Sequence, residues 1–454
     1  MPDAPGKTAT RPGPLASARF ATAMARRPHR ALVDIAQLGD VVDVGYGPSR
    51  FTFAFGAEAN EAILSEQAGR LTWGEVLATL IPVDGPTALV VTDGPDHDRR
   101  RKLVQPAFHR RRIDGYVAVM AEEARRLAEG WADGATVEVH EAMRGCIRRI
   151  VVRTLFGDQF AEQAQRFGDL LEPALAYVQR PPTARIDRPW FPPYRRAMAA
   201  RDAADALVYE EIARRRSVLA AGPASEERPG DDDDVLAWLM EAVDGDALDD
   251  AELRDQVVSL IAAGYDTTAA AAAWLVHAVW SRPAVLAELR AEAERELPGG
   301  APPDAAALSR MPFLQGVVSE SLRLWPPGAM SGRKVHQDVE VCGATIPRGR
   351  MLLYSAWVTQ RDARWWPEPE RFEPGRWIQG HPAHQEVRPG AFVTFGGGAR
   401  RCIGFAMATT ELQVLAVELA RAVDLDVPPE PPEPTGLATT VPRGGLPAVV
   451  RRRR

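Results

Sequence analysis

The chain is poor in cysteine: it has three in 454 residues, and they lie far apart at Cys146, Cys342 and Cys402. An odd number of scattered cysteines argues against a disulfide framework and favours a reducing compartment. No CxxC pair is present to indicate a zinc site. Positive charge is not in excess either. Lys and Arg number 55 against 61 Asp and Glu, and the net charge of −6 argues against a general nucleic-acid binder.

A long uninterrupted apolar run is also missing. The most apolar long stretch, residues 257–280, carries Asp266 and two threonines near its middle. These polar side chains would be costly inside a bilayer, so the stretch predicts a buried helix rather than a membrane span. Residues 1–20 contain no apolar core of signal-peptide length and are interpreted as a flexible arm. We therefore expect no membrane anchor and a cytoplasmic location.

What the chain does contain is mostly helical periodicity. Apolar residues recur at helical spacing through much of the region between residues 94 and 324. Short alternating runs at 40–47 and 50–56, and again at 334–357, predict strands. The sequence thus predicts a mainly α fold with a smaller β-rich part, formed as one large domain over residues 21–454.

The third cysteine stands in the stretch FGGGARRCIG, among four glycines and two arginines. A cysteine thiolate is a soft ligand for iron, and glycines let a backbone approach a flat ring without a Cβ clash. Arg400 could pair with an acidic group on such a ring, and a helix starting just after Cys402 would direct its dipole at the thiolate. Read alone, the stretch is also compatible with an idle thiol.

A second unusual stretch, AAGYDTT, lies inside the apolar helix. Gly264 costs about 0.5–1 kcal/mol in a helix interior, and Asp266 and Thr267 are poor interior helix formers. One interpretation is that Gly264 makes room for a ligand, beside which Thr267 places a hydroxyl and Asp266 a carboxylate. The other is a local kink in which Thr267 bonds back to a carbonyl. The residues alone favour neither.

Two further pairs of charged residues carry information. Glu320 and Arg323, in ESLR, lie one helical turn apart in an apolar setting, which predicts a partly buried ion pair. Arg371, in PERF, is the arginine we expect to complete a Glu-Arg-Arg cluster with them.

The stretch HDRRR places His97 and Arg101 on one helical face, where they suit a carboxylate partner. Arg99, Arg100 and Lys102 are interpreted as a solvated basic face.

Together these residues resemble the cytochrome P450 family of haem-thiolate monooxygenases. The motifs occur in the family's order from about residue 94 to 404, and each is weak alone. The family's haem signature, F-x-x-G-x-R-x-C-x-G, is matched by Phe395, Gly398, Arg400, Cys402 and Gly404. Its oxygen-activating motif, A-G-x-D/E-T-T, is matched by Ala263, Gly264, Asp266, Thr267 and Thr268. The E-x-x-R pair is Glu320 and Arg323, and the H-x-x-x-R pair is His97 and Arg101.

The resemblance implies a role for each residue. Cys402 would be the axial thiolate ligand of heme b (iron protoporphyrin IX), shielded by Phe395. Thr267 would hydrogen-bond the co-substrate O2, and Asp266 would relay protons, so these two are the expected catalytic residues. The further residues expected to bind the cofactor, four of them through its propionates, are His97, Arg101, Gly264, Arg333, Gly398, Arg400 and Gly404. Glu320, Arg323 and Arg371 would be structural.

The implied activity is insertion of one oxygen atom into a lipophilic small molecule by hydroxylation or epoxidation. Since no reductase follows the haem motif, electrons from NAD(P)H are expected to arrive through a ferredoxin and a ferredoxin reductase, with basic residues such as Arg99, Arg100 and Arg401 receiving the ferredoxin. We expect a monomer whose substrate pocket is walled partly by residues 76–93 and 170–195. The alternatives are a peroxide-using or isomerising member, which the Asp266–Thr267 pair disfavours, and a non-catalytic haem sensor.

Overall fold

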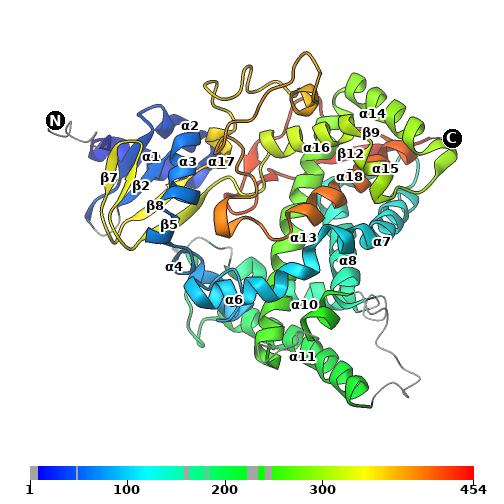
Figure 1. The fold of residues 1–454 in the computed structure, drawn as a ribbon, viewed down its shortest axis with the longest axis horizontal. Helices are drawn as coiled ribbons and strands as arrows, with labels where there is room; N and C mark the ends of the chain where they lie inside the picture. Colours follow the sequence, from blue (N-terminus) through cyan, green and yellow to red (C-terminus); the bar gives the residue numbers. More distant parts are fainter. Residues whose placement is uncertain are drawn as a thin grey trace. The chain divides into compact units, whose positions relative to one another are not determined.

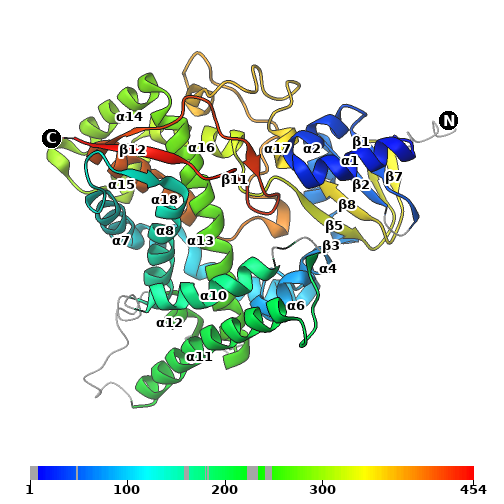
Figure 2. The same cartoon turned by 180° about the vertical axis from the view of Figure 1, so that it is seen from behind.

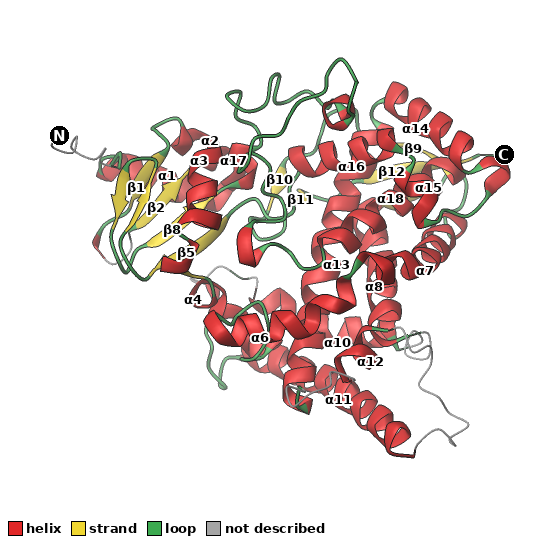
Figure 3. Ribbon diagram, viewed as in Figure 1, coloured by secondary structure: helices red, strands yellow, loops and turns green. Residues whose placement is uncertain are grey.

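The computed structural model describes residues 9–47, 50–157, 163–178, 180, 184–221, 234–240 and 248–453. Helices predominate and strands are few, as the sequence predicts (Figure 3). The chain divides into two units. Unit 1 takes the segments Met1–Val76, Ala124–Met143 and Thr267–Arg454, and unit 2 takes Leu77–Glu123 and Arg144–Asp266.

Unit 1 contains every strand of the described residues and about half of the helices. Its helices and helical turns are α1 (Pro14–Arg26), α2 (Pro28–Ala36), α3 (Ala57–Glu61), η2 (Ala62–Glu66), η3 (Ala68–Arg70), α14 (Pro283–Glu296), η7 (Pro298–Gly300), α15 (Ala305–Ser309), α16 (Pro312–Leu324), α17 (Ala356–Thr359), η8 (Pro374–Trp377), η9 (Gly398–Arg400) and α18 (Phe405–Ala422). Residues 14–20 of the predicted N-terminal arm belong to α1, and residues 1–8 lie outside the described part of the chain.

The strands of unit 1 form one five-stranded sheet and three smaller ones. The five-stranded sheet has the order β1 (Val41–Val44), β2 (Phe51–Ala54), β8 (Met351–Tyr354), β5 (Ser331–Val335) and β3 (Leu71–Thr72). The smaller sheets are β4 (Thr136–Glu138), β12 (Pro447–Arg452) and β9 (Val423–Asp426); β6 (Val339–Val341) and β7 (Ala344–Ile346); and β10 (Pro434–Thr435) and β11 (Val441–Pro442). The parallel pairing of β2 with β8 joins strands 300 residues apart, since Phe51 lies opposite Met351. The strands predicted within residues 40–56 and 334–357 are confirmed.

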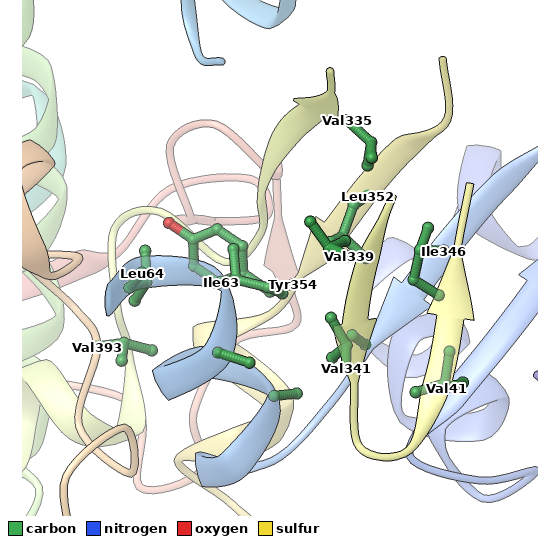
Figure 4. Packing of buried hydrophobic residues seen from close by; sticks show 14 of the residues in the cluster. Val41, Ile63, Leu64, Val335, Val339, Val341, Ile346, Leu352, Tyr354 and Val393 are labelled. Atoms are coloured by element: carbon green, nitrogen blue, oxygen red, sulfur yellow. The ribbon is translucent and has the colours of Figure 1, made fainter. Parts of the chain in front are cut away.

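An apolar cluster fills the space between this sheet and the turn η2. Ile63 and Leu64 on η2 are 0% and 6% exposed, and they belong to one cluster with Tyr354 of β8 and Val393 (Figure 4). Because Val393 lies two residues before Phe395, this cluster anchors the segment that leads into the cysteine stretch.

Among the described residues of unit 2, helices joined by loops are the regular structure, and no strand is present. Its elements are η4 (Ala78–Leu80), α5 (Ile81–Asp84), α6 (Gly94–Val104), η5 (Gln105–Phe108), α10 (Ala164–Val178), α11 (Pro192–Ala221) and α12 (Val235–Met240). Four helices begin in one unit and end in the other: α4 (Gly74–Leu77), α7 (Arg110–Glu129), α8 (Val139–Phe156) and α13 (Asp250–Trp280).

The helix α13 is the long apolar stretch noted in the sequence. It runs without interruption through Gly264, so the predicted helix is confirmed (Figure 1). Five consecutive alanines, Ala269–Ala273, favour helix formation after the polar stretch and are all at most 3% exposed. No helix among the described ranges combines the length and the apolar character needed to cross a bilayer.

Candidate active site

The cysteine stretch folds into a tight loop in unit 1. The backbone N–H of Cys402 donates to the carbonyl of Phe395 at 2.8 Å, which closes the loop. Gly396 and Gly398 have φ of +67° and +58°, in the left-handed region that glycine adopts without strain. The glycines predicted to allow a close backbone approach therefore also have a conformational role.

The same loop rests directly on η2. A Cβ atom at Gly398 would lie 2.1 Å from the carbonyl oxygen of Leu64, and one at Gly397 would lie 3.2 Å from the Leu64 Cβ. The first contact is sterically impossible, so any side chain at position 398 would push the loop away from η2. The loop is held in one position by backbone packing.

Cys402 lies at the exposed end of this loop. The helix α18 begins three residues later at Phe405, after Gly404, so its unpaired N–H groups are close to the cysteine in the chain. The ring of Phe395 meets that of Phe405 edge to face at 6.2 Å, and the Arg401 guanidinium lies 4.0 Å from the Phe405 ring centroid. A cysteine presented at a rigid glycine loop before a helix N-terminus has the donor chemistry for a thiolate ligand of haem iron.

Two arginines expected to bind the cofactor also lie in unit 1. Arg333 on β5 is 4% exposed, and its guanidinium lies 3.9 Å from the centroid of the Trp73 ring. It also donates to the carbonyl of Gly332 at 2.8 Å. Arg400 ends η9 and is half-buried. Packing on an aromatic face restricts the Arg333 side chain to a narrow range of directions.

The pair His97 and Arg101 lies on α6 in unit 2. His97 is 2% exposed, and its Nδ1 lies 3.0 Å from a carboxylate oxygen of Asp98. Its neighbour Arg100 corrects one expectation. Instead of forming a solvated face, Arg100 is 8% exposed, and both Arg99 and Arg100 bind the carboxylate of Glu252 at the start of α13, at 2.9 and 3.0 Å. Lys102 is exposed, as expected.

Asp266 is held in an ion-pair network that the sequence did not indicate. Arg144 on α8 donates to Asp266 at 3.1 Å and forms a second ion pair with Glu172 of α10. The hydroxyl of Tyr265 donates to Glu172 at 2.9 Å. Burial raises the pKa of Tyr265 above its ordinary value, so this hydroxyl remains a donor. The carboxylate on α13 is thus oriented by a cation on a neighbouring helix.

Gly264 lies on the same helix, two residues before Asp266 and three before Thr267. A Cβ atom there would meet a Val151 methyl group of α8 at 3.6 Å, which is an ordinary van der Waals contact. Packing within unit 2 therefore does not require glycine at this position. The helix is continuous through Gly264, Asp266 and Thr267.

The segment predicted to wall the substrate pocket is fastened to α13. Asp255 accepts hydrogen bonds from the backbone N–H and hydroxyl of Thr87 at 3.0 and 2.7 Å. Gln256 accepts from the N–H of Leu89 at 3.0 Å. Asp84, 3% exposed, accepts from Ser259 at 3.2 Å, and burial raises its pKa to about 6. These contacts set the distance of residues 84–89 from the helix that carries Asp266.

The Glu320–Arg323 pair is fully buried in unit 1, and both side chains are 0% exposed. Arg323 donates twice to Glu320, at 2.8 Å each. The second arginine on Glu320 is Arg376, at 3.2 Å, and not Arg371. The Arg371 side chain is 59% exposed and pairs with nearby acidic residues, so the prediction that it completes the cluster is wrong. Only its backbone carbonyl takes part, accepting from Arg323 at 3.2 Å.

Sequence reasoning also missed residues that this geometry shows. After the ESLR helix the pattern Pro-x-Arg-aromatic occurs twice in close succession, first as PERF and five residues later as PGRW, and the second of these carries Arg376. That repetition could have identified Arg376 as a second candidate for the cluster. Arg144 and Glu172 had no such signal, because the pairs that Arg144 forms with Asp266 and with Glu172 join three separate helices.

The cysteine loop, the polar stretch of α13 and the buried Glu320–Arg323 pair are the elements on which the sequence resemblance rests. The model of the family described as cytochrome P450 matches residues 10–446. The chain therefore belongs to the cytochrome P450 family, whose monooxygenases hold haem through a cysteine thiolate and use dioxygen.

Among its relatives is the Mycobacterium tuberculosis protein named as a cytochrome P450 139, which is 38% identical over 86% of this chain and 89% of its own length. Cyclooctat-9-en-7-ol 5-monooxygenase of Streptomyces melanosporofaciens is 32% identical, over 92% of this chain and 90% of that protein. Pentalenene oxygenase of Streptomyces avermitilis is 28% identical, over 95% and 94%. Among solved structures, a cyanobacterial cytochrome P450 with bound retinoic acid superposes with a TM-score of 0.83, at 25% identity and covering 96% of each chain.

Proposed function

We propose that this monooxygenase inserts one oxygen atom of O2 into a lipophilic terpenoid, with Cys402 as the axial ligand of heme b. The observation that carries the proposal is the Cys402 loop, closed by the bond to Phe395 and seated on Leu64. When bound, the haem supplies the oxidising chemistry. Phe395, Gly398 and Gly404 would shape its seat, and the side chains of His97, Arg101, Arg333 and Arg400 would hold its propionates.

The polar stretch of α13 supplies the protein's part in oxygen chemistry. Thr267 would donate a hydrogen bond to dioxygen, and Asp266 would carry protons toward it. Arg144 supports this role, because its 3.1 Å ion pair holds the Asp266 carboxylate in one orientation. Both Asp266 and Arg144 are partly exposed, at 16% and 20%, so water can reach the carboxylate and supply its proton. The missing side chain at Gly264 would leave room for the ligand.

The relatives support a terpenoid among lipophilic substrates. Two of them are named for cyclooctat-9-en-7-ol and pentalenene, which are terpene-derived. Electrons would come from NAD(P)H through a ferredoxin and its reductase. Arg401, exposed and adjacent to Cys402, remains a suitable contact for an acidic ferredoxin. Arg99 and Arg100 are weaker candidates, because Glu252 already neutralises part of their charge.

Replacement of the proposed ligand tests the central claim. Cys402→Ala should abolish the thiolate-type Soret band of the reduced, CO-bound protein, because alanine has no donor for iron. Cys342→Ala is the matched control, since it removes a thiol elsewhere in unit 1, and it should keep the band. A thiolate-type band that persists in Cys402→Ala would refute the ligand assignment.

Replacement of Thr267 tests the oxygen chemistry. A substrate is first found by the shift that it causes in the haem spectrum, using a panel of terpenoids. With that substrate, Thr267→Ala should lower the product formed per NAD(P)H consumed by about 10-fold or more and raise peroxide release, because a positioned proton-transfer group contributes on the order of 10²–10⁴-fold. The neighbouring Thr268→Ala should remain coupled. Full coupling in Thr267→Ala would contradict the assigned role.

A further inference from the structure

The two N-terminal helices of unit 1 border an open groove, whose lining includes none of the residues assigned to the oxygenase site. Its volume is about 630 Å³. The α1 residues that line it are spaced three and four apart and thus form one helical face: Leu15, Ala18, Arg19, Thr22, Ala23 and Arg26. The α2 side contributes Arg27, Arg30, Ala31 and Asp34, again at helical spacing. Two helix faces therefore converge on one groove.

The charge of this groove is opposite to that of the whole chain. Four arginines against one aspartate give a net charge of +3, whereas the chain carries −6. Arg27 has a surface ion pair with Glu433 at 3.3 Å. Within the described part of the chain, Arg19, Arg26 and Arg30 have no ion pair. Three guanidinium groups are thus available to an anionic partner, and guanidinium binds phosphate oxygens in bidentate fashion.

The groove also presents an apolar contact at its rim. Leu15 is 78% exposed, more than any other large apolar side chain of the described ranges. The opposite face of α1 packs inward through Phe20, whose ring meets that of Phe53 at 5.4 Å. Figure 2 shows α1 beside α2 and the strands of the five-stranded sheet. Leu15 and the arginines are therefore directed away from the unit's core.

We infer that this groove is a peripheral docking surface for an anionic phospholipid bilayer. Phosphodiester headgroups would pair with Arg19, Arg26 and Arg30, while Leu15 enters the acyl boundary. Basic side chains flanking an apolar residue on an exposed helix are the arrangement that binds membrane interfaces. An acidic protein could bind the same arginines, but that alternative does not explain why an exposed leucine lies beside them. The association needs no spanning helix.

The test uses the full-length, haem-loaded protein and cosedimentation with vesicles. Wild type should bind vesicles containing phosphatidylglycerol, and salt should weaken the binding, whereas pure phosphatidylcholine vesicles should not bind it. The variant Arg19→Glu/Arg26→Glu/Arg30→Glu should reduce the partition coefficient by about 100-fold. Leu15→Asp should weaken binding that persists at high salt.

The matched control is Arg110→Glu/Arg166→Glu/Arg348→Glu, which changes the net charge equally at three exposed arginines elsewhere. It should retain binding, and an unchanged CO-bound spectrum in both triple variants shows that the haem site is intact. If both triple variants lost vesicle binding equally, the effect would come from net charge and not from the groove, and the proposal would be overturned. The proposal would also be overturned if wild type did not bind vesicles. It would be overturned as well if the groove variant lost binding to an acidic ferredoxin but still bound vesicles.

Discussion

Glu320 and Glu411 lie on two helices of unit 1, α16 and α18, and both are buried, at 0% and 2% exposed. Glu320 accepts hydrogen bonds from the side chains of Arg323, Arg376 and Trp377 and from the backbone of Glu373. Glu411 has an Oε1 atom with no hydrogen-bond partner in the described part of the chain. Burial raises the pKa of Glu411 to about 8.

Equal burial thus has opposite consequences for two identical side chains. A buried charge is tolerated where an opposite charge and enough donors surround it, and a carboxyl group without them keeps its proton. Glu320 anchors a network that joins α16 to the chain around Arg376. Glu411 is a neutral acid near pH 7 on the helix that starts after Cys402.

The largest effect is expected from breaking the satisfied site. Arg323→Met leaves the Glu320 carboxylate buried without its main partner and should lower the free energy of unfolding by about 3–5 kcal/mol. Thermal unfolding of the haem-loaded protein measures the loss. The double variant Glu320→Leu/Arg323→Met removes the charge as well and should be more stable than the single variant. An equally unstable double variant would show that packing, and not the unpaired charge, causes the effect.

The unsatisfied carboxyl group of Glu411 should make the stability of the protein depend on pH. A free glutamate titrates near 4.5, so between about pH 4.5 and 8 folded Glu411 holds a proton that the unfolded chain has released. Its contribution to stability is complete below pH 4.5 and is lost as the pH rises toward 8, by at most about 1.4 kcal/mol per unit.

Glu411→Gln removes this dependence, so the unfolding midpoint should fall less between pH 5 and 8 than in wild type. Glu430→Gln, at an exposed position, is the control and should follow wild type. Identical pH profiles for wild type and Glu411→Gln would mean that Glu411 is ionised in the folded protein.

The smallest effect distinguishes the two arginines that follow the cluster. Arg376→Gln removes a buried donor of Glu320 and should lower the unfolding free energy by about 1–3 kcal/mol. Arg371→Gln removes only exposed ion pairs and should change it by about 0–1 kcal/mol. Parallel thermal unfolding of the two variants gives the order, and a reversed order would restore Arg371 to the cluster.

The sequence predicted what depends on residues near one another in the chain. The loop before Cys402, the uninterrupted helix through Asp266 and the Glu320–Arg323 pair follow from short patterns, and the structure has each of these elements. Strand positions within residues 40–56 and 334–357 could also be predicted, because alternation and turns are local.

What the sequence did not show depends on distant contacts. Arg100 was expected in solvent, and its partner Glu252 lies 152 residues away. Arg144 pairs with Asp266, which lies 122 residues further along the chain, and neither helix has a sequence pattern that predicts this contact. Local periodicity says which face of a helix is buried but not which charge lies opposite.

The contact of Gly398 with Leu64 has a consequence for how the protein is assembled. It joins positions 334 residues apart, near the two ends of the chain. Contacts of such long sequence separation form late, since the intervening chain must first be ordered. During synthesis the turn that carries Leu64 emerges long before the cysteine loop. The surface on which the loop packs is therefore synthesised before the loop itself. The loop that carries Cys402, the proposed ligand, is then expected to be among the last parts of the fold to form, after the N-terminal segment on which it packs.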